Sequence, residues 1–167
     1  VSVDKKGRLV VFDTESFTET VAFEIDFHAT TTRVSDKYIV LAGVSHKAHK
    51  GKSTLPKGKV VVLDRVSFKQ ISRFEVDIVT EPTRYGDIYV PQVYDVAISD
   101  TRDQAVLTTY WKDGFGRSRL STKLLRVYDL ATGREVTSFH AGDRVEWLKF
   151  ENDGQEIWAQ NTKKKLG

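Results

Sequence analysis

The sequence predicts an all-β protein built from repeated units of four antiparallel strands. Three observations support this prediction. An apolar run that ends in aspartate recurs along the chain, and two kinds of hairpin alternate, one containing this run and one lying between its copies. No long stretch shows the periodicity of an amphipathic helix. Self-similarity at a nearly fixed spacing is the signature of stacked structural units.

The recurring phrase is clearest in its first two copies. Val11-Phe12-Asp13, with Phe17, Phe23 and Asp26 after it, reappears 51 residues later as Val62-Leu63-Asp64 with Phe68, Phe74 and Asp77. A third copy, Val127-Tyr128-Asp129 and then Phe139, lies 65 residues further on. We therefore expect Asp13, Asp64 and Asp129 to accept hydrogen bonds from backbone N–H groups of the following turn, a structural role rather than a catalytic one.

Each copy of the phrase belongs to one kind of hairpin. A run rich in β-branched and aromatic residues ends at the aspartate, a short polar turn follows, and a second run alternates apolar and polar residues as a half-buried strand does. The predicted strand pairs are 9–12 with 20–25, 59–64 with 71–76, and 125–129 with 135–139.

A second kind of hairpin lies between these copies. Its predicted strand pairs are 31–34 with 38–42, 93–98 with 105–109, and 145–150 with 156–159. The turn Asn152-Asp153-Gly154 is a strong hairpin signal, because Asn and Gly tolerate a positive φ at little cost.

The order of strands is therefore two, four, four and two, and a repeat of four antiparallel strands over roughly 40–65 residues is typical of a β-propeller blade. We expect one propeller segment over residues 1–167, with an outer half-blade at 1–26, a blade at 27–77, a blade with long insertions at 78–141 and an inner half-blade at 142–167. Closed propellers have about 4–8 blades, and an open arc leaves strand edges exposed. The predicted partial ring, of about three blades, is therefore expected to be completed by further blades of the same protein or of another chain.

The phrase Val127-Tyr128-Asp129-Leu130-Ala131-Thr132-Gly133-Arg134 resembles the third strand and turn of WD-repeat and YVTN-type propellers. The Trp-Asp pair of the WD family is replaced here by Phe12-Asp13, Leu63-Asp64 and Tyr128-Asp129, and the Gly-His pair that opens many WD blades is missing. The resemblance to WD-repeat proteins implies a scaffold for protein–protein interaction. The resemblance to YVTN-type and quinoprotein-like domains implies an enzymatic or ligand-binding propeller, which remains an alternative.

Composition excludes several classes of site. The 167 residues include no cysteine, which excludes disulfides, zinc–thiolate sites and cysteine nucleophiles. No apolar run approaches the roughly 20 residues that span a bilayer. No nucleophile, base and orienting group share a recognisable motif, so we expect no catalytic residue and no cofactor. His46 and His49 are surrounded by lysines that repel a cation, so we expect no metal site either.

The long connections all belong to the class that joins strands at one face of a propeller. Residues 43–58, 78–92 and 111–123 and the tail 161–167 carry net charges of +4, −1, +3 and +3, together +9, whereas the whole chain carries +3. Binding residues often lie on loops that a rigid scaffold supports, so this basic face is the predicted binding face.

We expect this face to bind a protein partner, possibly an acidic one, without chemistry of its own. The predicted contact residues are cations that steer the partner and aromatics that anchor it: Lys47, Lys50, Arg84, Tyr85, Trp111, Arg117 and Arg119. Binding of RNA or another nucleic acid by the same face is an alternative, because aromatics interleaved with basic residues can also stack bases.

Overall fold

The computed structural model describes residues 2–3, 7–13, 15–45, 57–76, 90–112, 118–119, 124–141 and 145–161. Within these ranges the regular structure consists of antiparallel β-strands and one 3-10 turn, η1 (Asn152–Gly154). The all-β prediction is therefore confirmed. No helix in the described ranges is long and apolar enough to cross a membrane.

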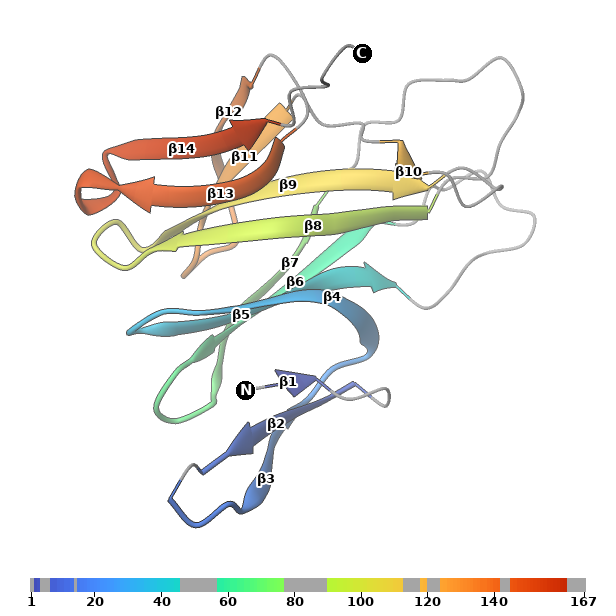
Figure 1. Ribbon diagram of the computed structural model, residues 1–167, viewed down its shortest axis with the longest axis vertical. Helices are drawn as coiled ribbons and strands as arrows, with labels where there is room; N and C mark the ends of the chain where they lie inside the picture. The colour runs from blue at the N-terminus through green and yellow to red at the C-terminus, as the bar shows by residue number, and fades with distance from the viewer. Residues whose placement is uncertain are drawn as a thin grey trace, which may run out of the picture.

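The strands form four sheets that follow one another along the chain (Figure 1). The first sheet contains β1 (Ser2–Val3), β2 (Arg8–Phe12) and β3 (Glu19–Glu24), and the second contains β4 (Phe27–Val34), β5 (Tyr38–Ser45), β6 (Gly58–Asp64) and β7 (Gln70–Val76). The third contains β8 (Val90–Ser99), β9 (Gln104–Lys112), β11 (Leu124–Asp129) and β12 (Glu135–His140), with the short β10 (Ser118–Arg119) on the end of β9. The fourth contains β13 (Val145–Glu151) and β14 (Glu156–Asn161).

All twelve strands predicted from the two kinds of hairpin are present, and all but one of them are longer than expected, by one to four residues. The second and third sheets each join one hairpin of each kind, through the pairs β5–β6 and β9–β11. Each is therefore a meander of four antiparallel strands, as the sequence predicts. Two strands of two residues each lie outside the prediction: β1, which pairs with β2, and β10, which pairs with the end of β9.

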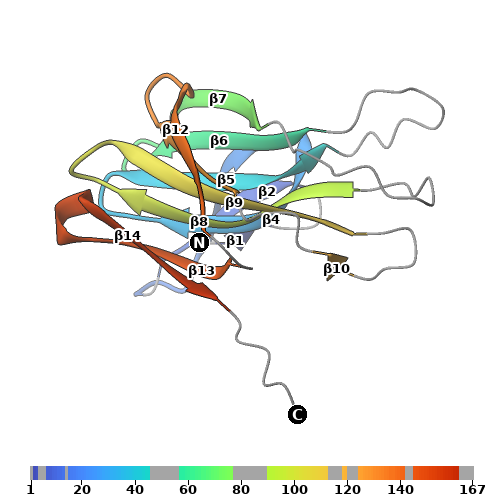
Figure 2. The same ribbon diagram turned by 90° about the horizontal axis from the view of Figure 1, so that it is seen from above.

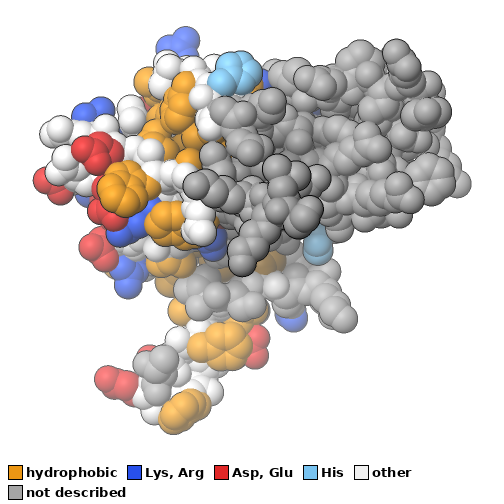
Figure 3. Space-filling view, turned by 45° about the horizontal axis from the view of Figure 1, so that its top comes forward, with side chains coloured by type: hydrophobic (Ala, Val, Ile, Leu, Met, Phe, Trp, Pro, Cys, Tyr) orange, Lys and Arg blue, Asp and Glu red, His pale blue; other side chains and the backbone are white. Residues whose placement is uncertain are grey.

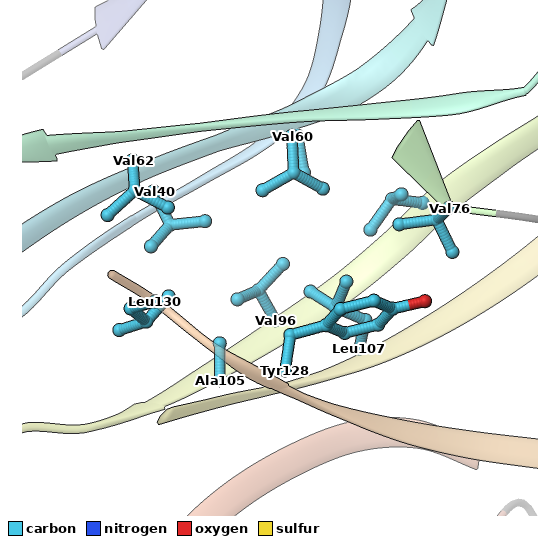
Figure 4. Close-up of a cluster of buried hydrophobic side chains, with 11 residues drawn as sticks. Val40, Val60, Val62, Val76, Val96, Ala105, Leu107, Tyr128 and Leu130 are labelled. Atoms are coloured by element: carbon cyan, nitrogen blue, oxygen red, sulfur yellow. The ribbon is translucent and has the colours of Figure 1, made fainter. Parts of the chain in front are cut away.

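Three hydrophobic clusters fill the spaces between successive sheets. In β6, Val61 and Leu63 face the first sheet, whereas Val60 and Val62 face the third sheet in the cluster of Figure 4. This strand is apolar on both faces because it lies between two sheets, so its sequence shows a continuous run of valines rather than an alternation. Burial of each such side chain contributes about 1.5–3 kcal/mol relative to exposure.

The repeat is visible in the backbone as well as in the sequence. The first strands of the last three sheets, β4, β8 and β13, each contain a β-bulge at the same place, between Ala29 and Thr31, Val93 and Asp95, and Val145 and Trp147. Aligning the three sheets on these bulges shows which of their residues occupy equivalent positions. Residues at matching positions in different sheets are called counterparts below.

Six hairpin turns lie at one end of the stack of sheets, on the left in Figures 1 and 2. The first turns join β4 to β5, β8 to β9 and β13 to β14, and the second turns join β2 to β3, β6 to β7 and β11 to β12. We call this end the turn end. The opposite strand ends flank residues 46–56, 77–89, 113–117 and 120–123, and we call that end the basic end.

Candidate functional site

At the basic end, the strands on either side of the long connections lie next to one another. Gly58 pairs with Val44 and with Val76, so β5, β6 and β7 end or begin side by side. Lys112 pairs with Val90 and with Ser118, so β8, β9 and β10 also begin or end side by side. The described strand ends therefore bring the flanks of the predicted binding loops to one end of the sheets.

The predicted contact residues fall mostly outside the described ranges. This is the case for Lys47, Lys50, Arg84, Tyr85 and Arg117, which remain predictions. Trp111 and Arg119 are described in their backbone only: they lie directly opposite each other in β9 and β10, and Pro91 of β8 lies opposite Trp111 on the other side. The structure thus brings two of the seven residues together.

Described cations near the basic end are paired with carboxylates. Asp26, in the connection from β3 to β4, accepts hydrogen bonds from Lys59, at 3.3 Å, and from Arg73. Burial alone would raise the pKa of Asp26, but these two hydrogen bonds and charges outweigh it, and the pKa lies below its ordinary value. Lys57 forms an ion pair with Glu75 at 3.4 Å. Part of the positive charge counted in the sequence is therefore neutralised where the connections meet the sheets.

The turn end repeats one hydrogen-bonded motif in each of the first three sheets. The carboxylate of Asp64 accepts hydrogen bonds from the backbone N–H of Val66 at 3.1 Å and of Ser67 at 2.7 Å, and from the Ser67 hydroxyl. The carboxylates of Asp13 and Asp129 accept the same kinds of bond from the turns that follow them. The structural role predicted for these three aspartates is confirmed.

These hydrogen bonds favour the charged form of each aspartate. The backbone N–H groups of Ser16 and Ser67 are the main cause that lowers the pKa of Asp13 and of Asp64, and the Thr132 hydroxyl is the main cause for Asp129. A carboxylate that is held ionised as a hydrogen-bond acceptor is poorly suited to act as a general acid.

The first turns are tied to one another across the sheets. Asp100, in the turn from β8 to β9, accepts hydrogen bonds from the Ser35 hydroxyl at 2.6 Å and the Asp36 N–H at 2.9 Å. The Lys37 ammonium donates to the Asp100 carbonyl at 2.7 Å. Between the first turns of the third and fourth sheets, the Thr101 hydroxyl donates to the Asp153 carbonyl at 2.6 Å. The three first turns therefore form one continuous network.

First and second turns of the same sheet are joined as well. The backbone N–H of Arg65 donates to the Lys37 carbonyl, and the N–H of Leu130 donates to the Asp103 carbonyl, each at 2.9 Å. Asp103 also accepts hydrogen bonds from the Tyr38 hydroxyl and from Lys37. Both bonds lower the pKa of Asp103, and the bond from Tyr38 has the larger effect. The turn end is consequently fixed by its own hydrogen bonds.

An open hollow of about 400 Å³ lies at the turn end between the first turns of the third and fourth sheets. It is lined by Ile98, Ser99, Asp100, Thr101, Phe150, Glu151, Asn152, Asp153 and Gly154. Gly154 is needed here, because its φ is +80° and an added Cβ would lie 2.1 Å from the Ser99 Oγ. The hollow lies between two turns that contact each other. The Asp100 carboxylate that lines it already accepts hydrogen bonds from Ser35 and Asp36.

One buried carboxylate links three sheets. Asp95 of β8 is 3% exposed, and its Oδ1 accepts hydrogen bonds from Arg33 of β4 at 2.5 Å and from the Val96 N–H at 2.9 Å. Its Oδ2 accepts a hydrogen bond from the Leu148 N–H of β13 at 3.1 Å. Asp95 therefore fastens the first strands of the last three sheets to one another.

Sequence reasoning missed Asp95 and the network between the first turns. A signal for the network was present, since Ser35-Asp36 and Ser99-Asp100 each follow a predicted strand directly. No comparable signal marked Asp95, whose counterparts Thr31 and Trp147 differ from it in chemistry, so only the packing of the sheets shows its role.

The chain is not assigned by comparison with known proteins. No protein-family model matches it, and no curated protein matches it significantly. In the part of the chain that the structure describes, no group of three His, Asp or Glu side chains could hold a metal ion. The basic end stays the predicted binding face, and the described turn end is held by hydrogen bonds within the fold.

Proposed function

We propose that this chain is part of a β-propeller that binds an acidic segment of a protein partner at its basic end. The observation that carries the proposal is the contrast between the two ends. The three first turns and the three second turns lie at the turn end and are fixed by hydrogen bonds, whereas the flanks of the long connections meet at the opposite end. Such a division is typical of a rigid scaffold with binding loops.

The stacking of the sheets supports the propeller architecture. Consecutive four-stranded meanders follow one another face to face, and β8, the first strand of the third sheet, packs between β4 and β13, the first strands of its neighbours. Propeller blades pack in this way around an axis lined by their first strands. The resemblance of the Val127–Arg134 phrase to WD-repeat and YVTN-type propellers points in the same direction.

Charge and residue type support the choice of partner. Lys47, Lys50, Arg117 and Arg119 supply positive charge that steers an acidic chain toward the loops, and Trp111 supplies an anchor of the kind that dominates protein interfaces. Catalysis is not part of the proposal. The repeated aspartates accept hydrogen bonds within turns, and these bonds favour the ionised form of each carboxylate.

A titration with a fluorescent poly-glutamate peptide tests this function. Fluorescence anisotropy is measured at several salt concentrations for the native chain, for Lys47→Glu combined with Lys50→Glu, and for Trp111→Ala. We expect the affinity to fall as salt rises, and each variant to weaken binding by about tenfold or more. Lys69→Glu is the matched control, because this exposed lysine lies in a second turn at the other end, and it should leave binding unchanged.

The same titration with a single-stranded poly-uridine probe distinguishes a nucleic-acid partner. Tighter binding of the RNA, with a loss spread evenly over the lysines and a salt slope near −0.7 for each neutralised phosphate, would replace the protein partner with RNA. Binding of neither probe, or equal binding by the Lys47–Lys50 double variant and the native chain, would refute a role for the basic end.

A further inference from the structure

We propose that Lys59 and Arg73 form a carboxylate-binding site at the basic end, and that Asp26 occupies this site while no partner is bound. The acidic segment of a partner then binds by exchange, because one of its carboxylates replaces Asp26 between the two cations. The inference rests on the proposed function, since it names a contact for the same acidic partner and an internal competitor that regulates its binding.

Three segments of the chain build the site. Lys59 is the second residue of β6, Arg73 lies in the neighbouring strand β7, and Asp26 lies in the connection from β3 to β4. The Asp26 carboxylate accepts one hydrogen bond on each oxygen, from Lys59 at 3.3 Å on Oδ2 and from Arg73 on Oδ1. One carboxylate thus bridges both cations, and a carboxylate of a partner can accept the same two charge-assisted bonds.

The site lies beside the predicted binding loops. Lys59 follows Gly58, which pairs with Val44 of β5 and with Val76 of β7. At these strand ends β5, β6 and β7 end or begin side by side, and they flank residues 46–56 and 77–89. An acidic segment bound to those loops is therefore close to Lys59.

The repeat itself does not require the two cations. Residues at the 51- and 65-residue offsets of the repeat are Arg8 and Ala22 in the first sheet, and Leu124 and Ser138 in the third. Neither sheet has both positive charges of Lys59 and Arg73, yet the third sheet forms the same meander of four strands. Asp26 does belong to the recurring phrase, whereas its two partners belong to the second sheet alone. This favours a role for the pair beyond the fold.

Exchange of the carboxylate disturbs little of the structure. The Asp26 side chain is 59% exposed, and its backbone is fixed by the buried Phe27 and by the hydrogen bond from the Ile25 N–H to the Gly7 carbonyl at 2.8 Å. Only the side chain has to move, and ion pairs this exposed contribute little to stability. The Lys59 side chain is 17% exposed and so stays in place to receive another carboxylate.

Exchange, rather than simple addition, is expected because charges on the described surface are already matched. Beside the site, Lys57 forms an ion pair with Glu75 at 3.4 Å. Figure 3 shows one face of the molecule, on which the described Lys and Arg side chains (blue) are interspersed with Asp and Glu side chains (red). An acidic partner therefore competes with carboxylates of the chain, and Asp26 is a competitor that holds two cations at once.

Removal of the competitor tests the site first. In the anisotropy titration with fluorescent poly-glutamate, Asp26→Asn should bind about three- to tenfold more tightly than the native chain, because two exposed ion pairs no longer have to open. Asp36→Asn is the matched control. Asp36 also pairs with an arginine, Arg65 at 3.2 Å, but at the turn end. Lys59 and Asp64 are separated by about 17 Å of strand, more than the Debye length of about 10 Å at 0.1 M salt, so the control should change binding by less than about twofold.

A double-mutant cycle separates a local site from a change in net charge. Arg73→Gln should weaken peptide binding, and its 40% exposed side chain makes the variant tolerable to the fold. In the Arg73→Gln background Asp26→Asn should give a clearly smaller gain than in the native chain, because one of the two cations that it frees is missing. Circular dichroism of each variant confirms that it is folded.

The outcomes separate this inference from the proposed function. Equal binding by Asp26→Asn and the native chain, with weaker binding by the Lys47–Lys50 double variant, would overturn the competition by Asp26 and leave the proposed function intact. Equal gains from Asp26→Asn with and without Arg73 would mean that net charge alone acts, and would also overturn it. Failure of both the native chain and Asp26→Asn to bind would overturn both. Binding by Asp26→Asn alone would support Asp26 as the internal competitor.

Discussion

Replacement of Asp95 by alanine is the sharpest test of the way in which the sheets are held together. Its carboxylate accepts hydrogen bonds from the Leu148 N–H of β13 at 3.1 Å, from the Val96 N–H at 2.9 Å and from the Arg33 guanidinium of β4 at 2.5 Å. Leu148 and Val96 are buried, at 5% and 1% exposure. Removal of the carboxylate therefore leaves two N–H groups unpaired in a region that water reaches poorly.

The magnitude follows from the burial of each partner. A buried N–H that loses its acceptor costs about 1–3 kcal/mol, so two cost about 2–6 kcal/mol. The Arg33 side chain is 47% exposed and regains water, so the ion pair adds at most about 1 kcal/mol. We expect Asp95→Ala to lower the free energy of unfolding by about 3 kcal/mol, which in a domain of this size lowers Tm by roughly 6–12 °C. That loss is a large fraction of the total stability of a typical domain.

Urea and thermal unfolding followed by circular dichroism measure this effect, with Arg33→Ala as the matched control. Loss of Arg33 removes one donor from the buried Asp95 Oδ1, which keeps its hydrogen bond from the Val96 N–H, and one donor from the Val96 carbonyl, but it leaves no N–H group unpaired. Its loss should therefore cost about 1–2 kcal/mol, less than loss of Asp95. Equal costs for the two variants, or a cost below about 1 kcal/mol for Asp95→Ala, would refute the view that Asp95 acts mainly by satisfying the backbone of the neighbouring sheet.

Two further predictions concern the second turns. The pKa values of Asp13, Asp64 and Asp129 lie below the ordinary 3.8 in the folded chain, so the stability they contribute is present above about pH 4 and is lost as the pH falls through the folded values. Unfolding free energies measured from pH 5 to pH 2 should therefore fall, and should fall less steeply when all three residues are asparagine; an unchanged slope would contradict this. Gly133 has a φ of +68°, and an added Cβ would lie 2.6 Å from the Phe74 ring, so Gly133→Ala should cost about 1–3 kcal/mol in urea unfolding, and a neutral effect would contradict the close contact.

The strands were predictable because their signal is local. Alternating residues in the strand after each second turn, the apolar runs that end at Asp13, Asp64 and Asp129, and the polar turns between them all act within a few residues. The carboxylate caps were predictable for the same reason, since the acceptor and its donors lie two or three residues apart. The spacing of the copies then gave the number and order of hairpins, and so the four-stranded sheets.

The contact residues of the basic end illustrate the limit of a local signal. Charge counting identified the connections, but it did not show that Lys57 and Lys59 are paired with Glu75 and Asp26, residues brought near them by neighbouring strands and by the connection from β3 to β4. Nor did it show the strand β10, which places Arg119 opposite Trp111. Pairings of this kind depend on register, which the sequence leaves open where two strands are separated by a long connection.

The sequence by itself determined the all-β class, the repeat, the strand order and the aspartate caps, because each depends on side chains that are close in the chain. Only the tertiary structure decided which faces are buried and which are left open. Val40, Val106 and Trp158 occupy the same position in three sheets, yet two are buried and one is exposed, since a neighbouring sheet covers the first two alone. The role of Asp95 was likewise decided by the meeting of three sheets, because its partners Arg33 and Leu148 lie 62 residues before it and 53 residues after it.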